Sequence, residues 1–298
     1  KMKKLLSIIY DIFLSKLISY GLFNTANITI NNKKISFHDI GNNSLLENIA
    51  INGYKNHEGE VVKLIKNYNW EMAKFYDIGA NVGFYSVLVE LYHKQSLVFA
   101  VEPFPLNIKY IEELIKVNNL KFSIVNKAID KNDGENINFY FPTGKNSSKL
   151  TATGSLINSF NGSSGVFKDL PFKTISVETM SLDSLIPNDH ECTLVKIDSE
   201  GNEFNILSHS SLLKSDCVDF IIEIMINDLD KHKVFNLMIE NGYTGYLITN
   251  SGLIKEDRPL TLPRPDRNDR TLWRNHFFTK KTSSQIEKFS INTYGYWI

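Results

Sequence analysis

The residues best suited to chemistry lie in two short stretches, each at the end of an apolar run. The stretch KIDSEGNE holds four ionisable side chains, at Lys196, Asp198, Glu200 and Glu203. The stretch DIGANVGFYS holds Asp77, followed by Gly79, Asn81 and Gly83. Carboxylates can move protons or bind polar ligands, and glycines let a backbone turn sharply and approach a ligand closely. Both stretches are therefore candidate binding or catalytic segments.

The segments around these stretches indicate a parallel sheet. Apolar runs predict strands at AKFYDIG, SLVFAVEP, KFSIVNKAI, CTLVKID and CVDFIIEIM, and most are followed by an amphipathic helical pattern. Strands that alternate with helices favour an α/β fold with helices on both faces of a mostly parallel sheet. In such folds ligands bind at the carboxyl ends of the strands, which is where both stretches fall.

The KIDSEGNE cluster is only partly explained by local structure. Acidic residues in the first turn of a helix are favoured by the helix dipole, which accounts for Glu203 well and Glu200 tolerably. Lys196 and Asp198 are two residues apart and share one face of a strand. A lysine in so apolar a run needs a partner, and Asp198 or Glu223 of the neighbouring strand could provide one.

The DIGANVG stretch predicts a nucleoside site. The N–H groups that open the following helix favour negative charge, and Glu102, about 20 residues on, ends the next strand where an acid can bind ribose hydroxyls. Turn chemistry alone could also explain the glycines. The Gly-x-Asn-x-Gly spacing differs from a dinucleotide fingerprint, which disfavours an NAD-dependent oxidoreductase. It suits a nucleoside with an amino-acid tail, such as S-adenosylmethionine.

Five motifs in this order, DIGANVGFYS, AVEPFPLN, SLDSL, LVKIDSEGNEFNIL and DFIIEI, resemble the FkbM family of S-adenosylmethionine-dependent methyltransferases. The resemblance covers residues from roughly 60 to 250. It implies a Rossmann-like methyltransferase fold, with a mostly parallel seven-stranded sheet, one reversed edge strand and helices on both faces. It also implies O-methylation of a hydroxyl on a sugar, glycan or other small molecule.

The resemblance assigns roles by position. The loop around the methionine part of the cofactor would hold Asp77, Gly79, Asn81 and Gly83. Glu102 would hold the ribose, and Ala128 and Ile129 would flank the adenine, where Asp130 could instead make a polar contact. The resemblance places Asp198 near the methyl group but does not settle which residue is the base. The residues themselves add Lys196, Glu200 and Glu223 as catalytic candidates. Asp198, with Glu200 or Glu223, would orient or deprotonate the acceptor hydroxyl, while Lys196 tunes the carboxylates. No metal is expected, because the histidines lack ligand spacing.

The chain divides into three expected parts. Residues 1–58 form a helix and β-hairpin extension, residues 59–250 the methyltransferase core, and residues 251–298 a segment that packs on the core. Within the core, ENINFYF and KTISVETM predict an inserted β-hairpin. Their long polar connection is of the kind that is mobile, functional or both.

Two terminal features leave alternatives open. One apolar face of the N-terminal helix is expected to pack on the protein, or otherwise on a membrane surface or partner. This face consists of Leu5, Ile8, Ile9, Ile12, Phe13, Leu17 and Tyr20. All arginines lie between Arg258 and Arg274, with Arg264, Arg267 and Arg270 between them. They could bind an anionic substrate or pair locally with Asp257, Asp266 and Asp269; local pairing is favoured.

The composition of the chain limits the classes of binding partner that we expect. Lys plus Arg and Asp plus Glu both number 33, so no basic excess points to nucleic acid. Cys192 and Cys217 are expected to be buried reduced thiols, which favours a cytoplasmic protein, with membrane association left open. The expected function is methylation of a small-molecule or glycan hydroxyl. The alternative is a non-catalytic nucleoside-binding or assembly module with the same fold, and no oligomeric state is indicated.

Overall fold

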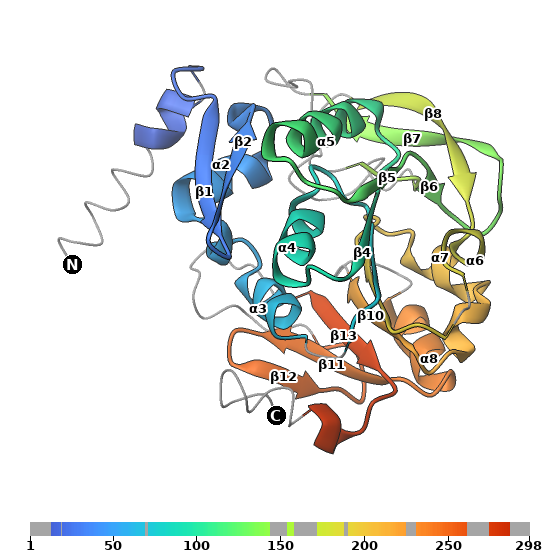
Figure 1. The fold of residues 1–298 in the computed structure, drawn as a ribbon. Helices are drawn as coiled ribbons and strands as arrows, with labels where there is room; N and C mark the ends of the chain where they lie inside the picture. The colour runs from blue at the N-terminus through green and yellow to red at the C-terminus, as the bar shows by residue number, and fades with distance from the viewer. Residues whose placement is uncertain are drawn as a thin grey trace.

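A computed structural model describes residues 13–18, 20–68, 71–143, 154–157, 172–187, 190–224, 231–260 and 274–286 (Figure 1). The first two strands, β1 (Thr25–Ile30) and β2 (Lys33–His38), form the expected hairpin. Asn31 and Asn32 form its turn with φ angles of 46° and 64°, a conformation that asparagine tolerates well. Two helices, α2 (Ser44–Asn52) and α3 (Gly59–Asn67), lead into the main sheet.

The main sheet has the strand order β12-β11-β13-β10-β9-β3-β4-β5. Its central strands are β3 (Lys74–Ile78), β4 (Leu97–Val101), β5 (Ser123–Val125), β9 (Thr193–Ile197) and β10 (Val218–Glu223). All neighbouring pairs among these five are parallel. The three β-strands from the C-terminal part are β11 (Thr244–Thr249), β12 (Gly252–Lys255) and β13 (Asn275–Thr279).

The C-terminal strands differ in two ways from the expected seven-stranded sheet. The reversed strand β13 lies inside the sheet, antiparallel to both β10 and β11, and not at its edge. An eighth strand, β12, folds back on β11 through a tight turn and forms the edge. The segment 251–298, expected to pack on the core, thus supplies a fully buried strand of the sheet at residues 275–279.

Helices cover both faces of the sheet, as predicted. On one face, α3, α4 (Phe84–Tyr92) and α5 (Pro105–Asn118) share a core with sheet residues such as Phe75 and Leu194. On the other face, α6 (Leu182–Leu185), α7 (Glu203–Ser208) and α8 (Lys231–Glu240) cover a second core that contains Tyr76 and Val195. Because strand side chains alternate, neighbouring residues of β3 and β9 enter different cores.

The inserted hairpin is also present, as β7 (Asn136–Pro142) and β8 (Phe172–Met180) (Figure 1, green to yellow). The stretch KFSIVNKAI, expected to be one strand, is two. Its first half is β5 of the main sheet, and its second half, β6 (Ala128–Ile129), pairs with β8. The split puts Ala128 and Ile129 in a small sheet beside the main one.

The apolar face predicted for the N-terminal helix is largely exposed in the part described, where only Leu17 of that face is half-buried. Residues 13–18 are helical, but Phe13 is exposed and Tyr20 is 77% exposed, while Ile18 is buried. Tyr20 lies in the turn after the helix, and its backbone N–H still donates to the carbonyl of Lys16 at 3.0 Å. The remaining residues of that face up to Ile12 lie outside the described residues.

Cys192 and Cys217 are free thiols, as expected, but both are half-buried because they precede β9 and β10 and do not lie within them. Among the helices described here, none has the length and apolar character needed to cross a membrane.

Candidate functional site

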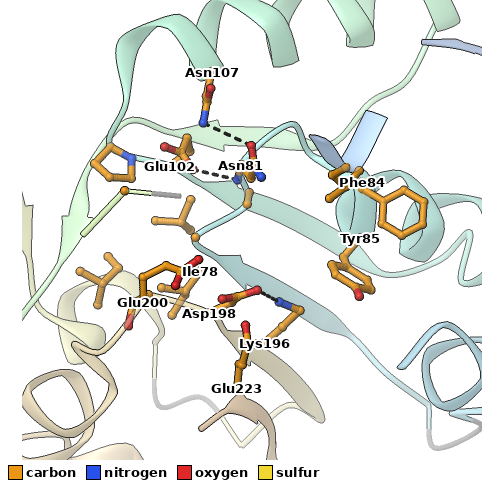
Figure 2. Close-up of a pocket in the computed structure, with 18 of the residues that line it drawn as sticks. Ile78, Asn81, Phe84, Tyr85, Glu102, Asn107, Lys196, Asp198, Glu200 and Glu223 are labelled. Atoms are coloured by element: carbon orange, nitrogen blue, oxygen red, sulfur yellow. Dashed lines mark hydrogen bonds and ion pairs between the residues drawn. The ribbon is translucent and has the colours of Figure 1, made fainter. Parts of the chain in front are cut away.

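A cavity of about 400 Å³ opens at the carboxyl ends of the parallel strands. Figure 2 shows two groups of side chains around it: Asn81, Glu102 and Asn107 in one part, and Lys196, Asp198, Glu200 and Glu223 in another. We call the first part, with Gly79, Asn81, Glu102, Ala128 and Ile129, the glycine-corner end. The second part, with Glu58, Lys196, Asp198, Glu200, Glu223 and Arg274, is the acid end.

The glycine corner connects β3 to α4 and can be built only with residues that accept positive φ. Gly79 has a φ of 78°, and a Cβ added there would lie 1.9 Å from the backbone oxygen of Asp198. Asn81 has a φ of 53°, and Gly83, the N-cap residue of α4, has a φ of 74°. The corner therefore packs closely against the end of β9, and this contact is possible because Gly79 has no Cβ.

Glu102 fixes the glycine corner to the end of β4. Its two carboxylate oxygens accept hydrogen bonds from the backbone N–H of Asn81 at 2.8 Å and of Phe104 at 2.9 Å. The Asn81 side chain in turn accepts a hydrogen bond from Asn107 at 3.4 Å. Burial raises the pKa of Glu102 to about 7, against the lowering effect of these N–H donors. Glu102 is thus a buried carboxyl on the cavity wall, where the sequence predicted a ribose-binding acid.

Ala128 and Ile129 line the cavity and are buried, as their predicted adenine-flanking place requires. Phe139 of the inserted hairpin and Leu156 extend this apolar wall. Asp130, the alternative polar contact, is not on the wall; its side chain accepts a hydrogen bond from Asn202 at 3.4 Å.

Asp77 is not on the cavity wall either. Its Oδ2 accepts hydrogen bonds from the backbone N–H and the hydroxyl of Ser86, at 3.0 and 2.8 Å. Burial raises the pKa of Asp77, although nearby Lys196 opposes the rise. The side chain links β3 to the first turn of α4. Asp77 therefore stabilises the glycine corner and does not face the cavity.

Lys196 and Asp198 form the predicted pair, with 2.8 Å between Nζ and Oδ2. The ammonium also lies 4.6 Å from the ring centroid of Tyr85. Burial alone would lower the pKa of Lys196, but Asp198, Glu58 and Asp77 together raise it above its usual value. Burial would raise the pKa of Asp198, yet Lys196 and a hydrogen bond from Glu223 keep it below its usual value. Both members of the pair are charged at neutral pH.

Glu223 lies between Asp198 and Arg274 at this end of the cavity. Burial, followed by the charge of Asp198, raises its pKa well above the usual value. Arg274 opposes the rise through an ion pair of 3.0 Å between its Nε and Oε1 of Glu223. Arg274, the last arginine of the cluster, therefore faces this site, whereas Arg264, Arg267 and Arg270 lie outside the described residues.

Glu200 and Glu203 have separate places. Glu200 lines the cavity, has a strained φ of 54°, and has its pKa raised to about 8 by burial and then by Asp198. Glu203 is buried away from the wall, where it accepts hydrogen bonds from the backbone N–H and the hydroxyl of Ser199 at 2.9 and 2.8 Å. It stabilises the loop that presents Glu200.

Sequence reasoning missed Glu58, Tyr85 and Asn275. Glu58 lies just before α3 with a φ of 43°, and it accepts hydrogen bonds from the Tyr85 hydroxyl and, at 3.0 Å, from the Asn275 amide. Burial would raise the pKa of Glu58, but His57 and Lys196 bring it below its usual value. Glu58 and Asn275 are 217 residues apart in sequence, and no local pattern joins them.

The Methyltransferase FkbM domain matches residues 77–244. No curated protein matched at a significant level. A precorrin-6y C5,15-methyltransferase from Geobacter metallireducens is 13% identical, with 74% of this chain and 86% of that chain covered and a TM-score of 0.37. A ribosomal protein L11 methylase from Lactobacillus delbrueckii is 12% identical, with 76% and 80% covered and a TM-score of 0.36.

A third similar structure is the N-terminal domain of human METTL16 in complex with SAH, at 13% identity, 76% and 70% coverage and a TM-score of 0.37. The family assignment depends on the domain match, which spans more than half of the chain. The matched residues also include the glycine corner and the end of β9, which together form much of the cavity wall. The chain belongs to the FkbM family of methyltransferases and has a Rossmann-like methyltransferase fold.

Proposed function

We propose that the protein is an S-adenosylmethionine-dependent methyltransferase that methylates a hydroxyl group of a sugar, glycan or other small molecule. The observation that carries this proposal is the two-ended cavity. A buried carboxyl and an apolar wall lie at one end. An ionised aspartate and a second acid, Glu200, whose pKa is raised to about 8, lie at the other.

The glycine-corner end fits the cofactor. Glu102 faces the cavity from the end of β4 and can accept hydrogen bonds from ribose hydroxyls, since each carboxylate oxygen can accept more than one. Ala128 and Ile129 offer an apolar surface for the adenine, and the bend at Gly79 leaves room for a close backbone approach. S-adenosylmethionine, when bound there, supplies an electrophilic methyl group.

The acid end fits the acceptor. Asp198 is ionised and held by Lys196, so it can accept a hydrogen bond from an acceptor hydroxyl and orient it. Glu200 has a pKa of about 8 and reaches the cavity, so in its ionised form it can take the hydroxyl proton. Glu223 is engaged by a hydrogen bond with Asp198 and by the ion pair with Arg274, which leaves Glu200 as the better-placed proton acceptor.

A thermal shift assay with S-adenosylmethionine, S-adenosylhomocysteine and NAD in parallel tests the cofactor. The first two are expected to raise the melting temperature and NAD is not. Stabilisation by NAD alone would contradict the proposal.

Mass spectrometry of candidate glycans and small alcohols, incubated with the protein and S-adenosylmethionine, then tests for the gain of one methyl group. Cofactor binding without transfer to any acceptor would favour a binding module.

A further inference from the structure

We propose that the acid end, completed by Glu58, Arg274 and Asn275, selects neutral polyhydroxylated acceptors and rejects acceptors that carry a carboxylate or phosphate. These three residues lie outside the matched domain, which covers residues 77–244. The inference deepens the proposed function and rests on it.

The three residues meet at the cavity wall. Glu58 comes from the segment before α3, while Arg274 and Asn275 come from the start of β13. Asn275 donates from its amide to Glu58 at 3.0 Å, and Arg274 pairs with Glu223 at 3.0 Å. The central position of β13 between β10 and β11 brings the two segments together.

The charges at this end are already matched. Lys196 is paired with Asp198. Arg274 lies 3.0 Å from Glu223 and also interacts electrostatically with Glu58, so each of the two cations has a carboxylate partner. Glu58 is held by hydrogen bonds from Tyr85 and Asn275. An anionic acceptor would have to break an ion pair, or enter beside several carboxyl groups without a cation of its own. Burying a charge in this way costs much more than burying a hydrogen-bonded hydroxyl.

The same wall offers positions for hydroxyl groups. The side-chain oxygen Oδ1 of Asn275 is buried and has no hydrogen-bond partner among the residues described, and the residue itself is 2% exposed. A buried acceptor of this kind is normally satisfied, and here an O–H from a ligand can satisfy it. Asp198 and Glu200 provide further acceptors, and Arg274 provides N–H donors to hydroxyl oxygens. A ring that carries several hydroxyls matches this mixture without adding net charge.

Saturation-transfer NMR on the full chain, saturated with S-adenosylhomocysteine, tests the selection. The probes are methyl glycosides of glucose, galactose and mannose, mixed in equal amounts with the corresponding uronic acids and 6-phosphates. We expect transfer to at least one neutral glycoside, at roughly ten times the level seen for its charged counterparts, because an ion pair need not be broken. Stronger transfer to the charged members, or no transfer to any glycoside, would overturn the proposal.

Two variants make the test specific. Glu58→Gln removes one negative charge while retaining an acceptor for Tyr85, so the preference for the neutral member over its uronic acid should fall several-fold. Asn275→Ala removes the unpaired oxygen and should weaken neutral binding roughly tenfold without favouring the acid. Glu240→Gln, at an exposed position on α8, is the matched control and should change neither. An unchanged preference in the folded Glu58→Gln protein would also overturn the proposal.

Calorimetric titration of the same proteins with S-adenosylhomocysteine separates the two claims. If the wild-type protein does not bind this ligand, the proposed function itself fails. If it binds with equal affinity in all variants while charged sugars are preferred, only the acceptor selection fails.

Discussion

The two ends of the cavity are built on different principles. At the glycine-corner end, shape is set by backbone: Gly79, Asn81 and Gly83 all have positive φ, and Glu102 is held by backbone N–H groups. At the acid end, shape is set by side chains that compensate each other's charge, as in the Lys196–Asp198 and Arg274–Glu223 pairs. The first end comes from contiguous segments, and the second is assembled from parts far apart in the sequence. Changes at the first end should therefore affect the fold or cofactor affinity, and changes at the second should affect the reaction.

The largest effect is expected for Gly79→Ala. The added Cβ would meet the Asp198 carbonyl at 1.9 Å, and the φ of 78° is strained for alanine, so the end of β9 must move. We expect a loss of roughly 2–4 kcal/mol in the free energy of unfolding, together with loss of cofactor binding. Gly134→Ala is the control, because its φ is 70° but nothing lies within 4 Å. Equal losses in denaturant melts of the two variants would contradict the close contact.

The next largest effect is expected for Asp198→Asn. The amide cannot replace the carboxylate that Lys196 holds at 2.8 Å, so we expect a fall in kcat of about 10²- to 10³-fold. Affinity for S-adenosylhomocysteine, measured by calorimetry, should change by less than about threefold if the residue serves the acceptor. Full activity in this variant would remove Asp198 from the mechanism.

Glu102→Gln tests the glycine-corner end, where a change should affect cofactor affinity more than the reaction. An amide retains one acceptor oxygen but places N–H donors against the backbone N–H of Asn81 or Phe104. We expect affinity for S-adenosylhomocysteine to fall about 10- to 100-fold, with kcat at saturating cofactor much less affected. A fall in kcat alone would show that the two ends are not separate.

The pH dependence provides a smaller effect. Glu200 has a pKa of about 8 and takes a proton only when ionised, so kcat should rise with pH and level off above about 8. The rising limb reports deprotonation, which means that activity is lost as pH falls through this pKa. In Glu200→Gln the limb should disappear along with most of the activity. A wild-type limb that persists in the residual activity of Glu200→Gln would assign the proton transfer to another group.

The smallest effect is expected for Asp130→Asn. Asp130 faces Asn202 and is not on the cavity wall, so cofactor affinity should stay within about twofold of the wild type. A tenfold loss in a calorimetric titration would instead support the polar adenine contact considered from the sequence.

Sequence reasoning was most successful where structure is local. The strand–turn–helix at Asp77 to Ser86, the hairpin at Asn31 and Asn32, and the Lys196–Asp198 pair each follow from neighbouring residues. The features that depend on residues far apart in the sequence could not be predicted in this way. Strand β13 lies in the middle of the sheet although it is distant in sequence from its neighbours. This position places Arg274 and Asn275 near Glu58. Asp77 also shows that a polar residue at a strand end can turn toward its own helix and away from the ligand site.

The most direct test of the central claim is a crystal structure of the protein with S-adenosylhomocysteine. The account predicts ligand density in the cavity, with the ribose hydroxyls at Glu102 and the adenine against Ala128 and Ile129. Density at another edge of the sheet, or an empty cavity at saturating ligand concentration, would contradict it.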